Sequence, residues 1–135
     1  MKYLKLLITL IMFTFILTGC AYDRGLILFN SVPITQNNAL HDQKTFNVDT
    51  KVYYLFIAPK KMNNDYIRVQ VFKMTDLAAR GGNEVVRTKD YRLMKDERYY
   101  HTNYFVFHEK GRYVMQVFSH DDFKNPIGVN YFYIQ

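Results

Sequence analysis

Four histidines are the residues best suited to metal binding or acid–base chemistry: His41, His101, His108 and His120. None has a second ligand at the spacing of a metal motif such as HExxH. His101 and His108 are seven residues apart in one predicted strand, so their side chains should point to opposite faces, about 23 Å apart at ~3.3 Å per residue. We therefore predict no metal site and no cofactor, and we assign Tyr99, His101 and Asn103 to the polar face of that strand.

A serine, a histidine and two aspartates also follow one another directly, as Ser119-His120-Asp121-Asp122. A catalytic triad needs its three groups to converge through space with hydrogen-bond contacts, whereas neighbours at the end of a strand diverge. We therefore expect no catalytic residue here, and a protein that is not an enzyme.

The loop that begins at His120 is the best candidate for binding. Residues 120–126 (HDDFKNP) join two predicted strands, and loops on rigid β scaffolds are where binding residues tend to lie. We expect Phe123 to be an anchor, with Asp121 and Asp122 as polar partners beside His120. A calcium site from the two aspartates is conceivable, but the spaced ligands and the glycine of a calcium loop are missing.

Tyrosines form a second candidate surface: Tyr53, Tyr54, Tyr99, Tyr100, Tyr104, Tyr131 and Tyr133. Adjacent tyrosines in a strand must place one ring on each face. Part of this set should therefore face outward, where it could contact a protein partner or stack on a glycan. Ordinary core packing with hydroxyls at the rim is the alternative.

The elements that position these residues are predicted to be β-strands. Residues 66–74 show the clearest alternation, with Ile67, Val69 and Val71 on one face and polar residues on the other. Further strands are predicted at 26–30, 52–58, 84–91, 99–107, 112–119 and 127–134, and residues 84–91 are rich enough in charge for an exposed edge. Residues 31–50 are predicted to form a tether or long loop, in which a short strand around 45–48 is an option. A brief helix-like stretch covers 75–83. About seven strands between turn signals indicate an all-β sandwich.

One motif narrows the topology. Glu109-Lys110-Gly111-Arg112-Tyr113-Val114-Met115 resembles the tyrosine corner of immunoglobulin-like sandwiches. The resemblance implies a hydrogen bond from the Tyr113 hydroxyl to backbone a few residues upstream, and it places Met115 where antibody domains have a core cysteine. The sequence has no tryptophan and no second cysteine, and transthyretin-like and other sandwiches remain open.

The first twenty residues have the layout of an export signal. Lys2 and Lys5 precede an apolar run, Leu6 to Leu17, that is shorter than the roughly 20 apolar residues needed to cross a bilayer. The following Leu17-Thr18-Gly19-Cys20 resembles the lipobox of bacterial lipoproteins. The resemblance implies a diacylglyceryl group on Cys20 and cleavage between Gly19 and Cys20. An uncleaved transmembrane anchor is the alternative.

These expectations divide the sequence into a signal peptide at 1–19, a lipidated N-terminus with a tether or first strand at 20–50, and a β-sandwich domain at 51–135. Residues 20–135 carry 16 basic and 12 acidic residues, a net charge of +4. Lipidation of Cys20 would leave no thiol for a disulfide, so the protein must rely on packing of the 11 tyrosines and 9 phenylalanines that residues 20–135 contain. Nucleic acid is not an expected partner, because the basic residues form no recognition motif.

The sequence thus favours a lipid-anchored cell-envelope protein without enzymatic activity, a binding or assembly component that holds a protein partner through a strand edge or an end loop. An accessory of a secretion or envelope complex is a specific version. The alternative is a surface lipoprotein that binds a small ligand, a glycan or a metal ion. Ala21 follows the cysteine where an aspartate would favour inner-membrane retention. This favours the outer membrane, facing the periplasm, in a Gram-negative cell, and otherwise the outer face of the cytoplasmic membrane.

Overall fold

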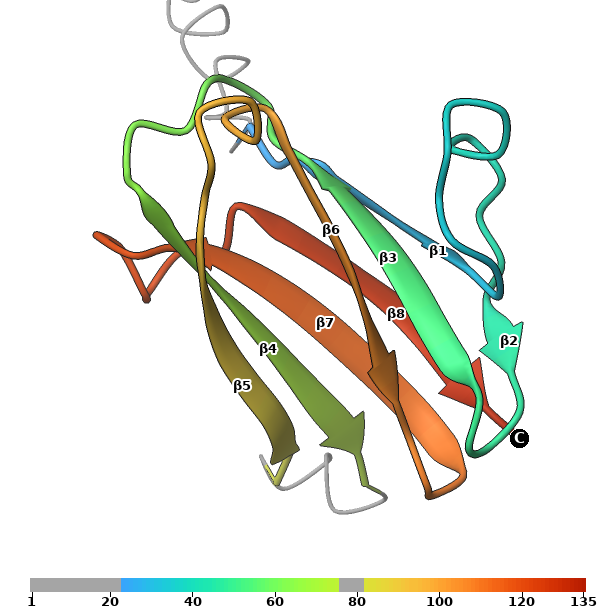
Figure 1. Cartoon of the computed structure of the whole chain (residues 1–135). Coiled ribbons are helices and arrows are strands. Elements are labelled where there is room, and N and C mark those ends of the chain that lie inside the picture. Colours follow the sequence, from blue (N-terminus) through green and yellow to red (C-terminus); the bar gives the residue numbers. More distant parts are fainter. Residues whose placement is uncertain (1–22, 76–81) are drawn as a thin grey trace, which may run out of the picture.

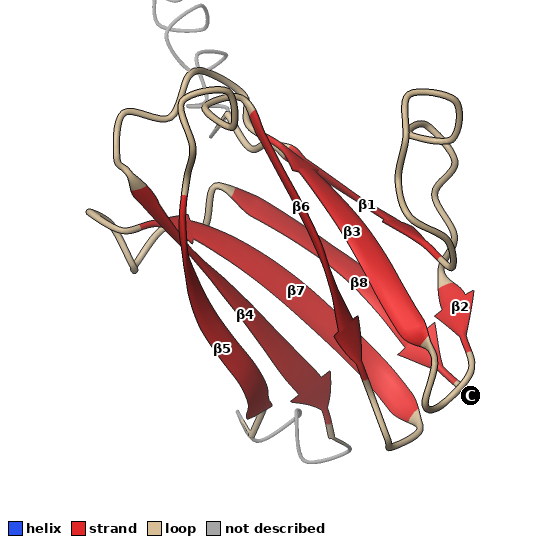
Figure 2. Ribbon diagram, viewed as in Figure 1, coloured by secondary structure: helices blue, strands red, loops and turns tan. Residues whose placement is uncertain are grey.

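The computed structural model describes residues 23–75 and 82–135, which form two β-sheets packed face to face (Figure 1). The predicted signal, Cys20 and most of the helix-like stretch lie outside these residues. The strands are β1 (Leu26–Asn30), β2 (Thr45–Phe46), β3 (Lys51–Ile57), β4 (Tyr66–Met74), β5 (Glu84–Arg92), β6 (Tyr100–Val106), β7 (Gly111–Ser119) and β8 (Gly128–Ile134). Over the described part of the chain, the ribbon consists of strands and loops (Figure 2).

The smaller sheet has the order β1-β3-β6 and the larger one the order β2-β8-β7-β4-β5. Neighbouring strands are antiparallel, except that β2 runs parallel to β8. The predicted all-β sandwich is confirmed, and the charged β5 lies at a sheet edge as its composition indicated. Residues 26–46 supply a strand to each sheet, so this part of the chain crosses from the smaller sheet to the larger one.

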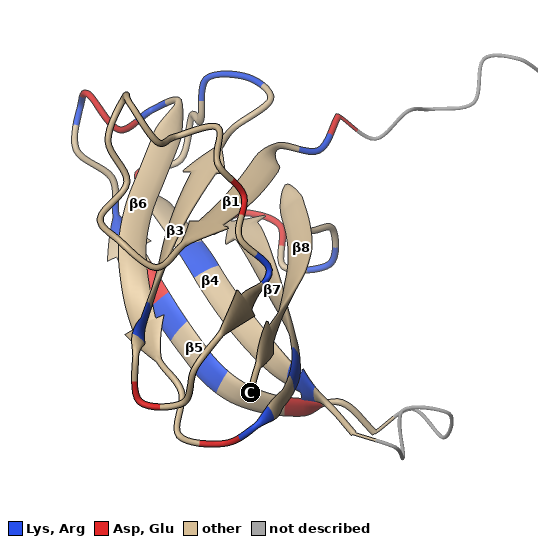
Figure 3. Ribbon diagram, turned by 90° about the vertical axis from the view of Figure 1, so that its right-hand side faces the viewer, with Lys and Arg blue, Asp and Glu red and all other residues tan. Residues whose placement is uncertain are grey.

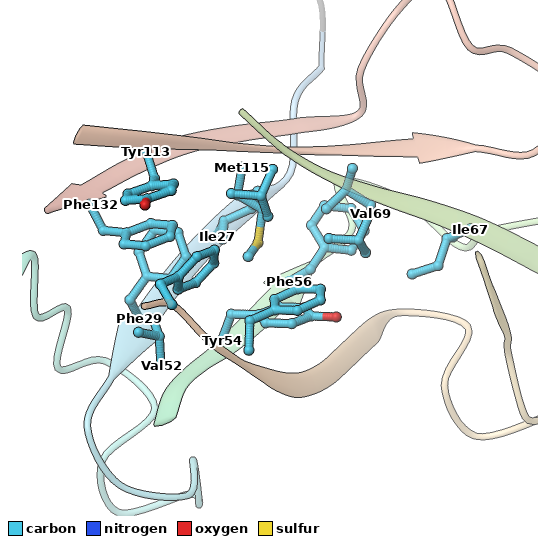
Figure 4. Packing of buried hydrophobic residues seen from close by; sticks show 14 of the residues in the cluster. Ile27, Phe29, Val52, Tyr54, Phe56, Ile67, Val69, Tyr113, Met115 and Phe132 are labelled. Carbon is cyan, nitrogen blue, oxygen red and sulfur yellow. The ribbon is translucent and has the colours of Figure 1, made fainter. Parts of the chain in front are cut away.

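Alternation of buried and more exposed residues, clearest in β4, builds much of the core. Ile67, Val69 and Val71 of β4 are almost fully buried, as their period of two predicted. The core contains no disulfide among the described residues, and aromatic rings fill it instead. Phe132 lies at the centre of one ring cluster, with centroids of Phe29, Phe107, Tyr113 and Phe46 at 4.8, 5.3, 5.6 and 6.2 Å. Met115 points into the middle of the core (Figure 4).

The tyrosine of the predicted corner is buried at the start of β7. Its ring stacks on Phe132 with an interplanar angle of 10°, and its hydroxyl donates a hydrogen bond to the backbone carbonyl of Glu109 at 2.7 Å. This is the upstream backbone bond that the resemblance implied for Tyr113. It ties the start of β7 to the turn that connects β6 to β7.

The polar face predicted for residues 99–103 is wrong. His101 is buried and faces the core together with Phe105, whereas Tyr100 and Tyr104 face outward. Both faces of this strand mix aromatic and polar side chains, so composition does not indicate which face is buried. His108 lies beyond the end of β6, where its Nδ1 contacts Oδ1 of Asp49 at 2.6 Å.

The two sheets touch where β1 and β8 begin. Gly25 forms a parallel bridge with Gly128, and its amide donates to the carbonyl of Ile127 at 2.6 Å. A Cβ atom on Gly128 would lie 2.7 Å from the ring of Phe56, closer than real contacts allow. The absence of a side chain at this position lets the aromatic core approach the backbone.

Candidate binding surface at the β7–β8 loop

The loop between β7 and β8 is fixed against the neighbouring β4. It projects from one end of the larger sheet (Figure 1). The amide of His120 donates to the carbonyl of Tyr66 at 3.2 Å, and the two rings lie 5.7 Å apart. The imidazole also meets the ring of Phe123 edge-on at 5.1 Å. His120 and Phe123, both predicted binding residues, are therefore in direct contact.

Phe123 covers an arginine on the sheet surface. The guanidinium carbon of Arg68 lies 4.2 Å from the centroid of the Phe123 ring, within the range of a cation–π contact. Arg68 is held by two hydrogen bonds to the carboxylate of Asp90, at 2.7 and 2.9 Å. Arg68 and Asp90 are direct partners in the pairing of β4 with β5. The flat guanidinium is therefore fixed on one side by a carboxylate and packed against an aromatic ring.

Electrostatics reinforces this arrangement. The hydrogen bonds from Arg68 hold the pKa of Asp90 below its usual value, and the carboxylate in turn raises the pKa of Arg68. Nε2 of His120 lies 3.6 Å from Oδ2 of Asp90, one of the two oxygens that accept from Arg68. We define Tyr66, Arg68, Asp90, His120 and Phe123 as the end cluster.

The two aspartates predicted as polar partners shape the loop instead of joining the end cluster. Asp121 accepts a hydrogen bond from the hydroxyl of Ser119. Asp122 accepts bonds from the amides of Lys124 and Asn125 at 2.9 and 3.2 Å and from the Asn125 side chain at 2.9 Å. The Asn125 side chain and then the Lys124 amide are the main causes of the lowered pKa of Asp122. Such bonds are typical of an aspartate that closes a turn.

Neither a triad nor a metal cluster is assembled within the described residues. The hydroxyl of Ser119 bonds Asp121, and the imidazole of His120 faces Asp90 and Phe123. In ranges 23–75 and 82–135, no three His, Cys, Asp or Glu side chains are grouped so that they could hold an ion.

Three members of the end cluster were missed by sequence reasoning: Tyr66, Arg68 and Asp90. The alternation of β4 placed Arg68 on the solvent face, but Asp90 is 22 residues away and only the strand register brings it opposite. A charged residue on each of two adjacent strands was the available signal.

The tyrosine set is divided between several surroundings. Tyr54 is fully buried, whereas Tyr99, Tyr100, Tyr104, Tyr131 and Tyr133 are each about half exposed. Tyr100 and Tyr104 lie on the outer face of the smaller sheet, and Tyr131 and Tyr133 on the outer face of the larger one.

Two cations accompany the tyrosines of the larger sheet. The guanidinium of Arg112 lies 4.9 Å from the Tyr131 ring and 6.0 Å from the Tyr133 ring, and Nζ of Lys44 lies 5.3 Å from Tyr131. The outer face of this sheet thus carries aromatic and cationic groups at both ends.

The outer face of the smaller sheet has an open groove of about 560 Å³. It runs between the β1–β2 loop and the strands β3 and β6, and its lining includes Ile34, Ala39, Leu55, Ile57 and Tyr100. This lining is mostly apolar.

No helix of the described residues is long and apolar enough to cross a membrane.

Comparison with known proteins identifies a fold. No protein-family model matches the sequence, and no curated protein matches it. An immunoglobulin-like protein from Pseudomonas aeruginosa is similar in structure, with a TM-score of 0.53 and 13% identity over 81% of this chain and 91% of that one.

Two β-glucosidases overlap more loosely. The enzyme from Listeria innocua has a TM-score of 0.41 at 13% identity, covering 86% of this chain and 16% of the enzyme. The enzyme from Kluyveromyces marxianus has a TM-score of 0.38 at 12% identity, covering 87% and 14%. The chain is an immunoglobulin-like β-sandwich of a three-stranded and a five-stranded sheet.

Proposed function

We propose that this protein is a lipid-anchored component of the bacterial cell envelope that holds a protein partner and catalyses no reaction. Cys20 carries the lipid in this proposal, and the sandwich presents the partner site. The observation that carries the proposal is the end cluster, in which the exposed ring of Phe123 and the half-buried guanidinium of Arg68 are already fixed in position at the end of the larger sheet.

The end cluster has the composition of a protein-binding site. Aromatic residues and arginine are enriched at protein interfaces and supply most of the strong contacts there. The hydrogen bonds that Arg68 donates to Asp90 orient the guanidinium before any partner arrives, so little side-chain freedom is lost on binding. Phe123 is 43% exposed, which leaves an apolar edge for a partner to cover.

The position of the anchor restricts where the partner can be. The N-terminal end of the sandwich is joined to the β7–β8 loop, because the amide of Gly25 bonds the carbonyl of Ile127. Only four residues lie between Cys20 and Gly25, so five Cα–Cα steps join the two, and the fully extended reach of these steps is about 17 Å. A lipid on Cys20 would therefore hold the end cluster close to the membrane surface, and the partner would contact it there.

Crosslinking in cells that produce the full chain tests both parts of the proposal. A photo-crosslinking residue at Lys124, beside the cluster, should give a defined adduct that Phe123→Ala or Arg68→Ala weakens. Tyr133→Ala, at the other end of the same sheet face, is the matched control and should leave the adduct unchanged. An adduct that survives both cluster variants would remove the end cluster from the proposal.

The anchor is tested separately by metabolic labelling with a clickable fatty acid. The wild-type chain should incorporate the label and the Cys20→Ser variant should not. Labelling that persists in the variant would refute lipidation at Cys20.

The groove on the smaller sheet favours a second candidate function, a surface lipoprotein that binds a small ligand. Its mostly apolar lining and the ring of Tyr100 would suit an apolar molecule or a sugar face. Ile57→Asp should abolish such binding and leave the crosslinked adduct intact.

A further inference from the structure

One edge of the smaller sheet lacks the devices that normally prevent edge-to-edge pairing. β6 has the sequence YHTNYFV, with no charged residue and no proline, and its pairing with β3 runs over seven residues without a bulge. Among the described strands, β6 pairs only with β3. A regular uncharged edge strand is a template on which a further strand can form.

The other strand edges are protected. β5 carries five charged residues in nine, and its pairing with β4 is interrupted by a bulge. Figure 3 shows charged residues on β5, in contrast to the uncharged β6. The edge of β1 is occupied by its own chain. The amide of Phe29 donates to the Asp42 side chain, and the carbonyl of Phe29 accepts from the amide of Gln43. The Asn130 side chain donates to the carbonyl of Ile27. β2 has only two residues.

The backbone of β6 shows which groups a new strand would meet. The amide of Tyr104 donates to the side chain of its neighbour Asn103 at 2.9 Å, a local acceptor in place of another strand. Amides alternate in direction along a strand, so the amide of Thr102 points to the same side as that of Tyr104. The outward side chains at this edge are Tyr100, Thr102 and Tyr104.

A strand added to β6 would extend the smaller sheet over β5. Tyr91 on the inner face of β5 packs against His101 of β6, with ring centroids 4.5 Å apart. This contact places β6 against the Tyr91 end of the inner face of β5. Lys89 and Arg87 follow Tyr91 on that inner face, opposite Val69 and Val71 of β4, yet both are exposed. The inward side chains of an added strand would approach these two cations.

We propose that β6 binds an extended segment of a partner protein by strand addition, and that this segment carries Asp or Glu at its inward positions. Backbone hydrogen bonds to β6 supply the affinity, and pairing of carboxylates with Arg87 and Lys89 supplies the selectivity. The inference rests on the proposed function in requiring a protein partner, and it names how that partner is held.

A second copy of this chain fits the edge less well. Pairing of β6 with another β6 would direct His101, Asn103 and Phe105 of the second copy toward Arg87 and Lys89. None of these side chains is an acid, so the cations would lose water without gaining a partner. Charge complementarity therefore selects an acidic strand.

A random twelve-residue peptide display library, selected on the folded domain (residues 20–135 with Cys20→Ser), tests this proposal without a known partner. Enriched peptides should carry acidic residues at alternate positions. They should bind the Arg87→Glu/Lys89→Glu variant at least tenfold more weakly, since two partly desolvated pairs become repulsive. Lys60→Glu/Lys61→Glu, the same charge change in the β3–β4 loop, is the control and should keep full affinity.

The site is located by amide hydrogen exchange with a selected peptide bound. Protection should rise at Thr102 and Tyr104, and Thr102→Pro should abolish binding, because an edge strand tolerates proline but then lacks the donor. The charge variant tests the proposal independently if the proline variant does not fold.

Several results would overturn strand addition at β6: no enrichment, enrichment insensitive to the Arg87 and Lys89 reversal, or protection confined to other strands. Concentration-dependent dimers that Thr102→Pro abolishes would overturn it in favour of a second copy. Peptide binding together with failed fatty-acid labelling would refute the anchor and leave the edge site intact.

Discussion

The hydrogen bond from Tyr113 to Glu109 gives the sharpest test of how this fold is held. Tyr113→Phe removes one hydroxyl and keeps the ring that stacks on Phe132 and packs against Phe107. The lost bond is neutral, and Glu109 is exposed, so water can reach its carbonyl after the change. We therefore expect the free energy of unfolding to fall by about 1 kcal/mol, the net value of an ordinary hydrogen bond.

Urea unfolding of the domain without the signal measures this loss as a lower midpoint at constant slope. A loss of about 1 kcal/mol also corresponds to a decrease in Tm of roughly 3–6 °C for a domain of this size. Tyr131→Phe is the matched control, because Tyr131 lies half exposed on the outer face of the sheet. A Tyr113→Phe variant as stable as that control would refute the idea that the corner bond stabilises the fold.

Two further predictions concern the interior. Burial lowers the pKa of His101, so below the ordinary histidine value of about 6.5 the unfolded chain binds a proton that the folded chain does not. The free energy of unfolding should therefore decrease as the pH falls from about 7 to 5, by at most ~1.4 kcal/mol per pH unit for this one group. Substituting His101→Phe should flatten that decrease, and an unchanged slope would contradict it. At the contact between the sheets, Gly128→Ala should cost about 1–3 kcal/mol by overpacking against Phe56, and an unchanged urea midpoint would show that the ring can move aside.

Much of the fold follows from local sequence, because each strand with one buried face shows it as alternation. The bounds of β4 match the prediction residue for residue, and the edge position of β5 followed from its charge. The buried face of β6 was predicted wrongly, because alternation is informative only where the two faces differ in polarity. His101 faces inward although it is polar, and Tyr100 and Tyr104 face outward although they are aromatic.

The end cluster was predicted only where it depends on neighbours in sequence. His120 and Phe123 are three residues apart, and the loop that carries them was visible between two strands. Arg68 and Asp90 joined them through strand register, which is a property of pairing across the sheet. Asp121 was assigned to binding from its charge, whereas a local hydrogen bond to Ser119 determines its orientation.

Buried polar groups are hydrogen-bonded in one part of the core and lack hydrogen-bond partners in another. Near the tyrosine corner, aromatic rings cluster around Phe132. The Tyr113 hydroxyl in this cluster donates a hydrogen bond to backbone. Beneath β6, by contrast, the hydroxyls of Tyr54 and Tyr91 and both ring nitrogens of His101 are buried without a hydrogen-bond partner. Burial, with Tyr91 close by, raises the pKa of Tyr54, so this group stays neutral and gains nothing from ionising.

Buried polar groups without partners cost free energy. The side of the domain where β5 and β6 meet should therefore have the lower local stability. The unprotected edge of β6 lies on this same side. A strand bound there would cover Tyr91 and His101 further and hold β6 in place. Native-state hydrogen exchange should therefore show β6 opening before β7 in the free protein. A bound acidic strand should slow that opening, linking the weak side of the core to the edge that accepts a partner.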